Sequence, residues 1–479
     1  MPVLNDVHSR LNPTDVARIV RPADTGEVAA VVRTAAEHAQ RISIGGCRHA
    51  MGGQQFGEGT VHIDTTALTS VSRFDDQRGL ITLGAGSTWP AIIDHTHAVQ
   101  RRLHPKREPR WGIRQKPTGA DDITLGGCVS ANIHGRGLVM QPFAADVEAL
   151  TVVSADGDII TCSRDRNAEL FSLVIGGYGL FGVVTEVTMR LGPRLKVRRL
   201  VDVIDLDDAV NAAQRRIARG CLYGDFQYAI DPRDEAFLRR GVLACYAPAE
   251  DSAPLSEESS DLRREDWLNL LALAHSDKSR AFLLYSQHYI ASHGRVYWSD
   301  QMQLSTYLPG YSEFIAELGA RNAANAARTP ESLVIGEYDV PPPRIMDFMD
   351  QARRILHRTG VEDIYGTLRL IRRDDTSFMP WASADFVCTI FNLRTPHTPE
   401  GRARTLETFA RLTDAALDLG GSFYLTYHRA ASAEQVLRCY PRFPDFLAAK
   451  KRYDPRGAFQ SDWYRHYAGA FAELGSASR

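Results

Sequence analysis

The chain has 479 residues and a formal net charge of −2, with 44% hydrophobic and 24% charged residues. A chain of this length exceeds what one hydrophobic core usually supports, so two or three domains are expected. The near-neutral charge gives no indication of a nucleic-acid partner or of an anionic membrane surface. Seven cysteines without a CxxC pair argue against a disulfide framework and against a metal site, and they favour a reducing compartment.

The first sixteen residues lack the basic and apolar layout of a signal peptide. The longest apolar stretch, residues 173–184, is interrupted by glycines and is too short to cross a bilayer. We therefore expect a cytoplasmic protein without a transmembrane segment.

Residues 12–195 are predicted to form an α/β domain with two lobes, because short strands alternate with helical patterns. Thr25 begins a helix whose apolar residues recur at helical spacing, and a hairpin is expected around residues 155–157. The predicted strands are 19–22, 41–44, 60–64, 80–84, 147–154, 158–162 and 183–191, and the predicted helices are 25–38 and a segment beginning at 88.

From about residue 195 the pattern changes to longer strands with helices between them, which predicts an α+β cap domain with an antiparallel sheet over residues 196–435. Residues 247–266 are rich in Ser, Glu, Asp and Pro and are expected to form an exposed loop. The predicted strands are 197–203, 224–230, 332–340, 364–371, 386–391 and 422–427, and the predicted helices are 266–275, 310–327, 344–359 and 401–419. Residues 436–479 are expected to return to the first domain, so the fold class is α+β.

Three loops of the first domain are rich in glycine and other small residues: 43–53, 117–135 and 176–184. Glycines allow tight turns and present backbone N–H groups to an anion such as a diphosphate. The first loop has neither the GK[ST] ending of a Walker loop nor the GxGxxG spacing, and by itself it is equally consistent with an ordinary loop at a strand end. Three such loops in one unit indicate an extended dinucleotide.

These segments resemble the PCMH-type FAD-binding domain of the vanillyl-alcohol oxidase family. Motif spacing is most similar to that of decaprenylphosphoryl-ribose oxidase and alditol oxidase, and the likeness covers nearly the whole chain. The likeness rests on IVRP, IGGCRHA, HID, LGAG, TLGGCVSANIHG, VEALTVVSADGDI, GGYGLFGVVTEVTM and the closing YDPRGAFQSDWYRHY.

The resemblance implies FAD as the cofactor. His49 occupies the place of a histidine that, in alditol oxidase, bonds covalently to the flavin 8α-methyl group. The decaprenylphosphoryl-ribose branch lacks this histidine. The alternative role for His49 is therefore to pack on the cofactor without a covalent bond. Cys128 is expected to be a small buried residue. The expected FAD contacts are Gly45, Gly46, Cys47, Arg48, His49, Ala50, Met51, Thr118, Gly119, Thr124, Gly126, Gly127, Ser130, Asn132, Ile133, His134, Gly135, Val183 and Val184.

The substrate side is expected on the strands of the second domain, where alternation places Thr367 and Arg369 on one face. Arg369 matches an active-site arginine of alditol oxidase, and Cys388 matches a cysteine beside the flavin of decaprenylphosphoryl-ribose oxidase. The essential lysine of that enzyme falls on Tyr427. No lysine lies between residues 278 and 450, so Tyr427 or its neighbour His428 is expected to handle the substrate proton.

His428 has an alternative reading as an ordinary core or surface histidine. Four further residues are weaker pocket candidates: Asn392, Glu337, Tyr338 and Gln227.

The sequence thus predicts an FAD-linked oxidase or dehydrogenase that oxidises an alcohol group of a sugar, polyol or sugar-derived metabolite by hydride transfer to flavin N5. In related enzymes a small residue just before this His-Gly pair favours reaction with oxygen, so the resemblance implies that bulky Ile133, before His134 and Gly135, favours a dehydrogenase or a slow oxidase. The expected electron acceptor is oxygen or another molecule. Two alternatives stay open: an NADPH-dependent reductase of carbon–carbon double bonds, of the sterol reductase type, and a non-catalytic flavin-binding protein.

Overall fold

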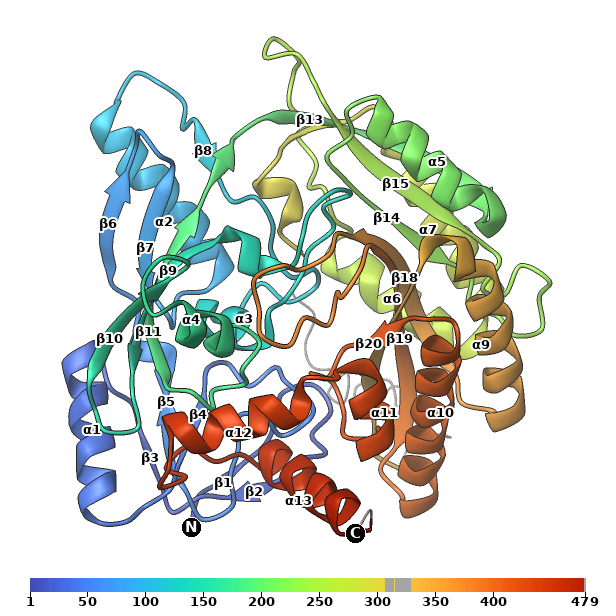
Figure 1. Ribbon diagram of the computed structural model, residues 1–479. Helices are drawn as coiled ribbons and strands as arrows, with labels where there is room; N and C mark the ends of the chain where they lie inside the picture. The colour runs from blue at the N-terminus through green and yellow to red at the C-terminus, as the bar shows by residue number, and fades with distance from the viewer. Residues whose placement is uncertain (306–313, 315–328, 478–479) are drawn as a thin grey trace.

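The computed structural model describes residues 1–305, 314 and 329–477, and its strands build three main sheets (Figure 1). A small parallel sheet contains β3 (Arg18–Val20), β5 (Val61–Asp64) and β4 (Ile42–Gly45). Two short pairs, β1 (Val3–Leu4) with β2 (Thr14–Asp15) and β8 (Trp111–Gly112) with β12 (Gly192–Pro193), complete the strands of the N-terminal part.

A second, antiparallel sheet also belongs to the N-terminal part and has the order β10 (Ile159–Ser163), β9 (Val147–Val153), β11 (Val183–Arg190), β7 (Leu80–Gly84) and β6 (Val71–Asp75). The helices between these strands are α1 (Thr25–Glu37), α2 (Trp89–Leu103), α3 (Leu125–Ala131) and α4 (Ala168–Val174). Asp24 caps α1 by accepting a hydrogen bond from the Glu27 N–H, and the apolar face of α1 is buried.

The third sheet has eight strands, and its neighbouring strands are all antiparallel. Its order is β16 (Val296–Trp298), β13 (Lys196–Asp205), β15 (Arg240–Pro248), β14 (Tyr223–Tyr228), β18 (Asp363–Ile371), β19 (Phe386–Pro396), β17 (Glu331–Val340) and β20 (Ser422–Phe423). The predicted α+β class with an antiparallel sheet is confirmed.

Helices cover the two faces of this large sheet differently. On the outer face lie α5 (Leu206–Ala218), α9 (Ile345–Thr359) and α10 (Pro399–Asp418) (Figure 1). Tyr338 of β17 points to this face, where its ring lies 6.0 Å from that of Phe348 on α9. Since side chains alternate along a strand, Glu337 and Asp339 point to the inner face. The inner face is partly covered by α6 (Arg264–Ser276) and α7 (Lys278–Ala291).

The C-terminal segment packs against the small parallel sheet (Figure 1). It contains α11 (Ala433–Cys439), α12 (Phe443–Tyr453) and α13 (Asp462–Ala477). Lys450 of α12 is buried, donates a hydrogen bond to the Leu180 carbonyl at 3.0 Å and pairs with Asp454. Phe459 then forms a parallel bridge with Ile42 of β4, which ties the end of the chain to its beginning.

Several expectations differ from the structure. The strand predicted at 422–427 contains only Ser422 and Phe423, and residues 425–427 form a turn. Helices α7 and α11 and strand β15 lie where the sequence pattern predicts no element. The helix predicted at 310–327 lies outside the described residues except for Phe314. Within the described part of the chain, every helix is too short or too polar to span a lipid bilayer.

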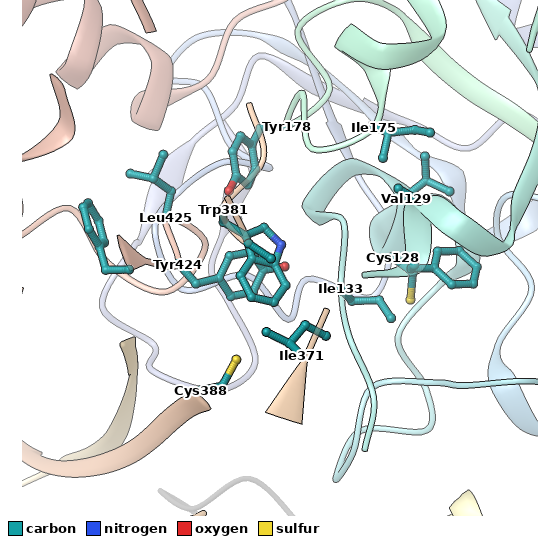
Figure 2. Packing of buried hydrophobic residues seen from close by; sticks show 14 of the residues in the cluster. Cys128, Val129, Ile133, Ile175, Tyr178, Ile371, Trp381, Cys388, Tyr424 and Leu425 are labelled. Atoms are coloured by element: carbon teal, nitrogen blue, oxygen red, sulfur yellow. The ribbon is translucent and has the colours of Figure 1, made fainter. Parts of the chain in front are cut away.

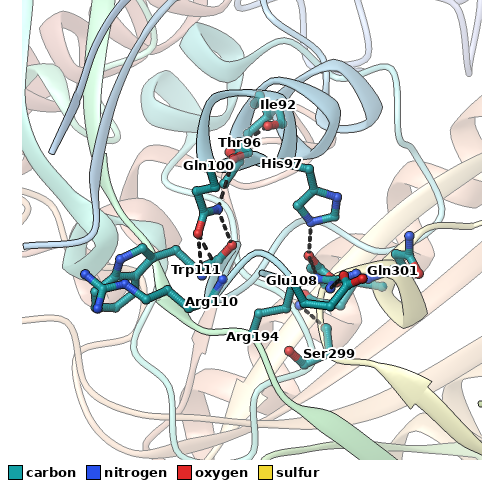
Figure 3. A network of polar contacts seen from close by, with 12 residues as sticks. Ile92, Thr96, His97, Gln100, Glu108, Arg110, Trp111, Arg194, Ser299 and Gln301 are labelled. Carbon is teal, nitrogen blue, oxygen red and sulfur yellow. Dashed lines mark hydrogen bonds and ion pairs between the residues drawn. The ribbon is translucent and has the colours of Figure 1, made fainter. Parts of the chain in front are cut away.

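A buried polar network joins α2 to the segment that follows β16 (Figure 3). The Asp300 carboxylate accepts hydrogen bonds from His97 Nε2 at 2.7 Å and from Arg194 Nε at 2.9 Å, and it is fully buried. Burial acts to raise the pKa of Asp300, but the hydrogen bond from His97 and the charge of Arg194 outweigh it and hold that pKa below its ordinary value. This network links the two halves of the molecule.

We predict that Asp300→Asn lowers the free energy of unfolding by about 3–5 kcal/mol, because it leaves the buried Arg194 cation only its longer, exposed contact with Glu108. The matched control is Asp418→Asn, which breaks an exposed pair with Arg438 and is expected to cost at most about 1 kcal/mol. Urea unfolding at neutral pH measures both.

The wild-type contribution is present at neutral pH and is lost as the pH falls through the lowered pKa of Asp300. Equal effects of the two substitutions at neutral pH would contradict the role given to the buried network.

Candidate functional site

A cavity of about 880 Å³ lies between the three glycine-rich loops and the inner face of the eight-stranded sheet. Residues 44–51, 117–134 and 178–184 contribute to one wall, and strands β14, β17, β18 and β19 contribute to the other. Loops that are distant in the sequence therefore meet around one space, as the glycine pattern predicted.

The first loop follows β4 and is held in a conformation that requires glycine. A Cβ atom on Gly46 would lie 2.1 Å from Thr124 Oγ1, so this position admits no side chain unless the second loop moves. Gln54 closes the loop from behind, because its amide donates to the Leu425 and Thr426 carbonyls at 3.1 and 2.9 Å. The first loop is thus packed against the second loop and against the turn that follows β20.

His49 lies at the centre of the first loop and lines the cavity. Its Nδ1 atom lies 2.7 Å from His8 Nε2, and its Nε2 atom lies 3.1 Å from an Asp122 carboxylate oxygen. Burial, and then the nearby His49, lower the pKa of His8 to about 4, so His8 is neutral at neutral pH. Burial raises the pKa of Cys47 to about 11, which keeps this neighbouring thiol protonated.

The second loop contributes backbone and small side chains around the start of α3. Lys116 precedes this loop and was missed by the sequence reading, which singled out no lysine there. Its buried ammonium lies 2.6 Å from Asp121 and donates to the Pro117 and Gln303 carbonyls, which holds the loop in place. The predicted FAD-contact residues that line the cavity are Gly45, Gly46, Cys47, Arg48, His49, Ala50, Met51, Thr118, Gly119, Thr124, Gly126, Gly127, Ser130, Ile133, His134 and Val184.

Three predicted contacts, Asn132, Gly135 and Val183, do not line the cavity. Asn132 has a left-handed backbone with φ 49°, and its amide group bonds Asp374 at 2.8 Å and the Ala144 N–H at 2.9 Å. Gly135 is a glycine because a Cβ atom there would lie 2.8 Å from the Lys116 carbonyl oxygen. Asn132 and Gly135 therefore shape the cofactor loop from behind it.

The strand register places the polar residues of the opposite wall in rows across the inner face. Glu337 of β17 pairs with Ile390 of β19, Ile390 pairs with Thr367 of β18, and Thr367 pairs with Gln227 of β14. Thr367 and Arg369 both line the cavity, as alternation along the strand predicted. Arg369 is largely buried and lies within no ion-pair distance of an acidic group among the described residues.

Glu337 is buried behind the cavity surface, at the junction of the two walls, and does not itself line the cavity. His134 Nε2, from the second loop, lies 2.9 Å from its carboxylate, and both side chains are buried. The Tyr427 hydroxyl lies 3.5 Å from the same carboxylate. Burial raises the pKa of Tyr427 well above its ordinary value, and the charge of Glu337 adds to this effect. The phenol therefore stays protonated and acts as a hydrogen-bond donor.

Cys388 and Asp339 lie on the inner face beside Glu337, in the row that includes Arg369. Cys388 is fully buried and does not line the cavity, so the structure does not bring it into direct contact with that space. Burial, followed by the charge of Glu337, raises the pKa of Asp339 well above its ordinary value, and burial likewise raises the pKa of the Cys388 thiol beside it.

His428 is placed away from the cavity. Its ring stacks on Phe409 of α10, with centroids 4.0 Å apart, and burial lowers its pKa to about 3. A histidine packed in this way has no access to a substrate, which corrects its candidacy as the base and favours the core alternative. Tyr338, another weak candidate, faces the outer helices, whereas Asn392 and Gln227 line the cavity.

Aromatic packing connects the second loop to the turn after β20 (Figure 2). The Trp381 ring lies 5.0 Å from Tyr424 and 5.1 Å from the His134 ring, and the Tyr424 hydroxyl donates to the Ala131 carbonyl at 2.5 Å. These contacts hold the loop that contains His134 in a fixed position against the turn that contains Tyr427.

The residues of the loop wall fit a dinucleotide. Glycines and short side chains leave room for a ligand against the backbone, as at Gly119, where a Cβ atom would have no neighbour within 4 Å. Basic Arg48 and the backbone N–H groups of the first loop are suited to a diphosphate. The enclosed part of the cavity, beside Ile133 and His134, is suited to a planar ring.

We predict that Gly46→Ala abolishes most flavin binding, because the added methyl group overlaps Thr124. The matched control is Gly469→Ala in α13, where a Cβ atom meets nothing within 4 Å. Flavin absorbance per mole of purified protein measures the effect, and a flavin content of Gly46→Ala equal to that of the control would contradict the geometry of the loop.

Comparison with known proteins identifies the cofactor. A family model described as an FAD binding domain matches residues 16–163. Cytokinin dehydrogenase 7 from Oryza sativa subsp. japonica is 31% identical over 196 residues, which are 38% of this chain and 34% of that protein. L-gulonolactone oxidase from Mus musculus is 26% identical over 175 residues, 36% of this chain and 37% of that protein. The chain thus matches about a third of the length of these curated relatives.

These findings confirm FAD as the cofactor and show an FAD-binding domain in a chain that is similar to a dehydrogenase and to an oxidase. An uncharacterized oxidoreductase of the fasciation locus of Rhodococcoides fascians, 30% identical over 173 residues, extends the same likeness to a bacterial protein; the match covers 36% of this chain and 37% of that protein.

Proposed function

We propose that the protein oxidises an alcohol group of a sugar, polyol or sugar-derived metabolite, with FAD as the acceptor of the hydride. The observation that carries this proposal is the contact of Glu337 with both His134 and Tyr427, at the junction of the cofactor loops and the sheet. A buried carboxylate next to a protonated phenol at the wall of a cavity is suited to removing a hydroxyl proton.

In this proposal Glu337 is the final acceptor of the substrate proton. Tyr427 donates its own hydroxyl proton toward Glu337 and accepts the proton of the substrate, so it transfers a proton without becoming a stable phenolate. Arg369 has no acidic partner in ion-pair contact among the described residues, and it orients the substrate oxygen by donating hydrogen bonds. FAD, when bound, supplies the two-electron acceptor for the hydride of the substrate carbon.

His134 positions Glu337 and shields it from water, since its ring is packed under Trp381. Cys388 and Asp339 extend the buried group behind Glu337. Burial raises the pKa of both groups, which disfavours a second negative charge beside Glu337.

We predict that Glu337→Gln slows anaerobic flavin reduction by the substrate by about 10²–10⁴-fold, because the amide cannot accept the proton. Tyr427→Phe is expected to slow it by a smaller factor, since water can replace the hydroxyl. Stopped-flow absorbance of the flavin measures both rates on a panel of polyols and sugar-derived alcohols.

His428→Phe is the control for these variants, because it keeps the stacking on Phe409 and lies outside the cavity. It is expected to leave the rate of flavin reduction unchanged. Cytokinins, which the names of the relatives mention, are included in the same panel. Flavin reduction by cytokinins and by none of the alcohols would overturn the choice of alcohols as substrates.

We also propose that His49 attaches FAD covalently. Its ring lines the cavity and is held on both sides by His8 and Asp122. The expected result is that acid-precipitated protein stays yellow and that its mass exceeds that of the polypeptide by one FAD. His49→Ala should release all its flavin into the acid supernatant, and release of all flavin from the wild-type protein would refute the bond.

The electron acceptor that we propose is a molecule other than oxygen. Ile133 lines the cavity just before His134, where a bulky side chain hinders the approach of oxygen to the cofactor. The reduced protein is therefore expected to react faster with a quinone or dye than with oxygen, and Ile133→Ala is expected to accelerate the reaction with oxygen. Rapid, stoichiometric peroxide formation by the wild-type protein would contradict this proposal.

A further inference from the structure

The cavity continues beyond the cofactor loops into a space between the sheet and the helices α6 and α7. Trp267, Leu270, Leu271 and Ala274 line it from α6, and their spacing places them on one helical face. Ala281, Phe282, Tyr285 and Tyr289 line it from one face of α7. We call the space lined by these eight residues the apolar chamber.

The two helices are anchored to the sheet at both ends of this chamber. At the junction of α6 and α7, Lys278 pairs with Glu362 at 2.8 Å, and Glu362 also pairs with Arg394 of β19 at 2.7 Å. At the far end, Arg199 of β13 donates to Ser292 and Tyr246 at 2.9 and 2.7 Å. These buried or half-buried contacts hold the helices against the sheet at both ends of the chamber. The space between the helices and the sheet stays open in the middle.

The sheet forms the opposite wall of the apolar chamber and carries polar side chains among apolar ones such as Ile364 and Ile390. Gln227 of β14 lines the cavity and forms no side-chain hydrogen bond with any of the described residues, and Asp225 lies two residues before it on the same face. The Tyr365 ring lies deep in the molecule, yet 39% of its surface is accessible because it faces the cavity. A large apolar ring facing an enclosed space is typical of a ligand-binding wall.

The strand pairing gives the distance from the apolar chamber to the proposed reacting group. Gln227 lies three strands from Glu337 in the same row, which is roughly 14 Å at about 4.8 Å per strand. Glu337 lies beside the cofactor loop, so the apolar chamber begins well beyond the reacting group. A molecule that occupies both places is longer than a single sugar ring.

We propose that the apolar chamber binds a hydrocarbon or aromatic group carried by the substrate, so that the substrate is an amphipathic alcohol rather than a free polyol. The hydroxylated head lies against Tyr427 and Arg369, with Glu337 behind Tyr427, and the apolar group lies between Tyr365 and the helices α6 and α7. This inference rests on the proposed function for the site of the head, but the binding of the apolar group is testable without any turnover.

The experiment titrates the FAD-loaded protein under anaerobic conditions with three probes that share one head: glycerol, 3-phenoxy-1,2-propanediol and 1-O-octylglycerol. Changes in the flavin absorption spectrum give a dissociation constant for each probe. The phenyl and octyl probes are expected to bind at least about tenfold more tightly than glycerol, because they bury apolar surface in the chamber.

Phe282→Ala is expected to weaken binding of the phenyl and octyl probes by about tenfold and to leave glycerol unchanged. The matched control on the same helix is Leu283→Ala, since Leu283 is 53% exposed and lies outside the cavity. Equal dissociation constants for the three probes, absence of any spectral change with the apolar probes, or equal effects of the two substitutions would overturn the proposal.

The same titration separates this inference from the proposed function. The apolar probes could bind tightly, in a way that depends on Phe282, while no alcohol reduces the flavin. This result would support the apolar chamber as a binding site and contradict the proposed alcohol oxidation. Flavin reduction by free polyols, with no preference for the apolar probes, would support the proposed alcohol oxidation and contradict binding of an apolar group in the chamber.

Discussion

The contact between His134 and Glu337 is the constraint on which the arrangement of the site depends. A buried carboxylate is costly unless a partner satisfies it, and here the partner comes from a loop of the FAD-binding part of the chain. This pair helps to fix the inner face of the eight-stranded sheet against the cofactor loops. Trp381 and Tyr424 pack around the pair and exclude water, which strengthens the interaction in a medium of low polarity.

The alternation of side chains along the strands of the large sheet separates structural from chemical roles. On β17, Tyr338 anchors the outer helices, while its neighbours Glu337 and Asp339 face the inner side. The same division on β18 directs Thr367 and Arg369 to the cavity. Because α6 and α7 cover only part of the inner face, one sheet bounds both the reacting centre and the apolar chamber.

Much of the fold was predictable because local patterns were strong. Glycine-rich loops, the helix that begins at Thr25 and most of the long strands follow from composition and periodicity. Tyr427 and His428 were placed on a strand, but this strand ends at Phe423, and the turn sends one ring to the cavity and the other to Phe409. The helix α7 was missed because its exposed face also carries apolar residues, Leu283 and Ile290, which weakens the ordinary amphipathic signal.

The sequence by itself determined the cofactor loops, the FAD-binding character and the strand that carries Arg369, because each depends on residues close together in the chain. Only the tertiary structure decided that Glu337 is a central residue, since its partners His134 and Tyr427 lie some two hundred residues before it and ninety after it in the chain. The apolar chamber likewise depends on two helices held across a sheet by Glu362 and Arg199. Such contacts carry no local pattern, because the surrounding fold creates them by bringing distant segments together.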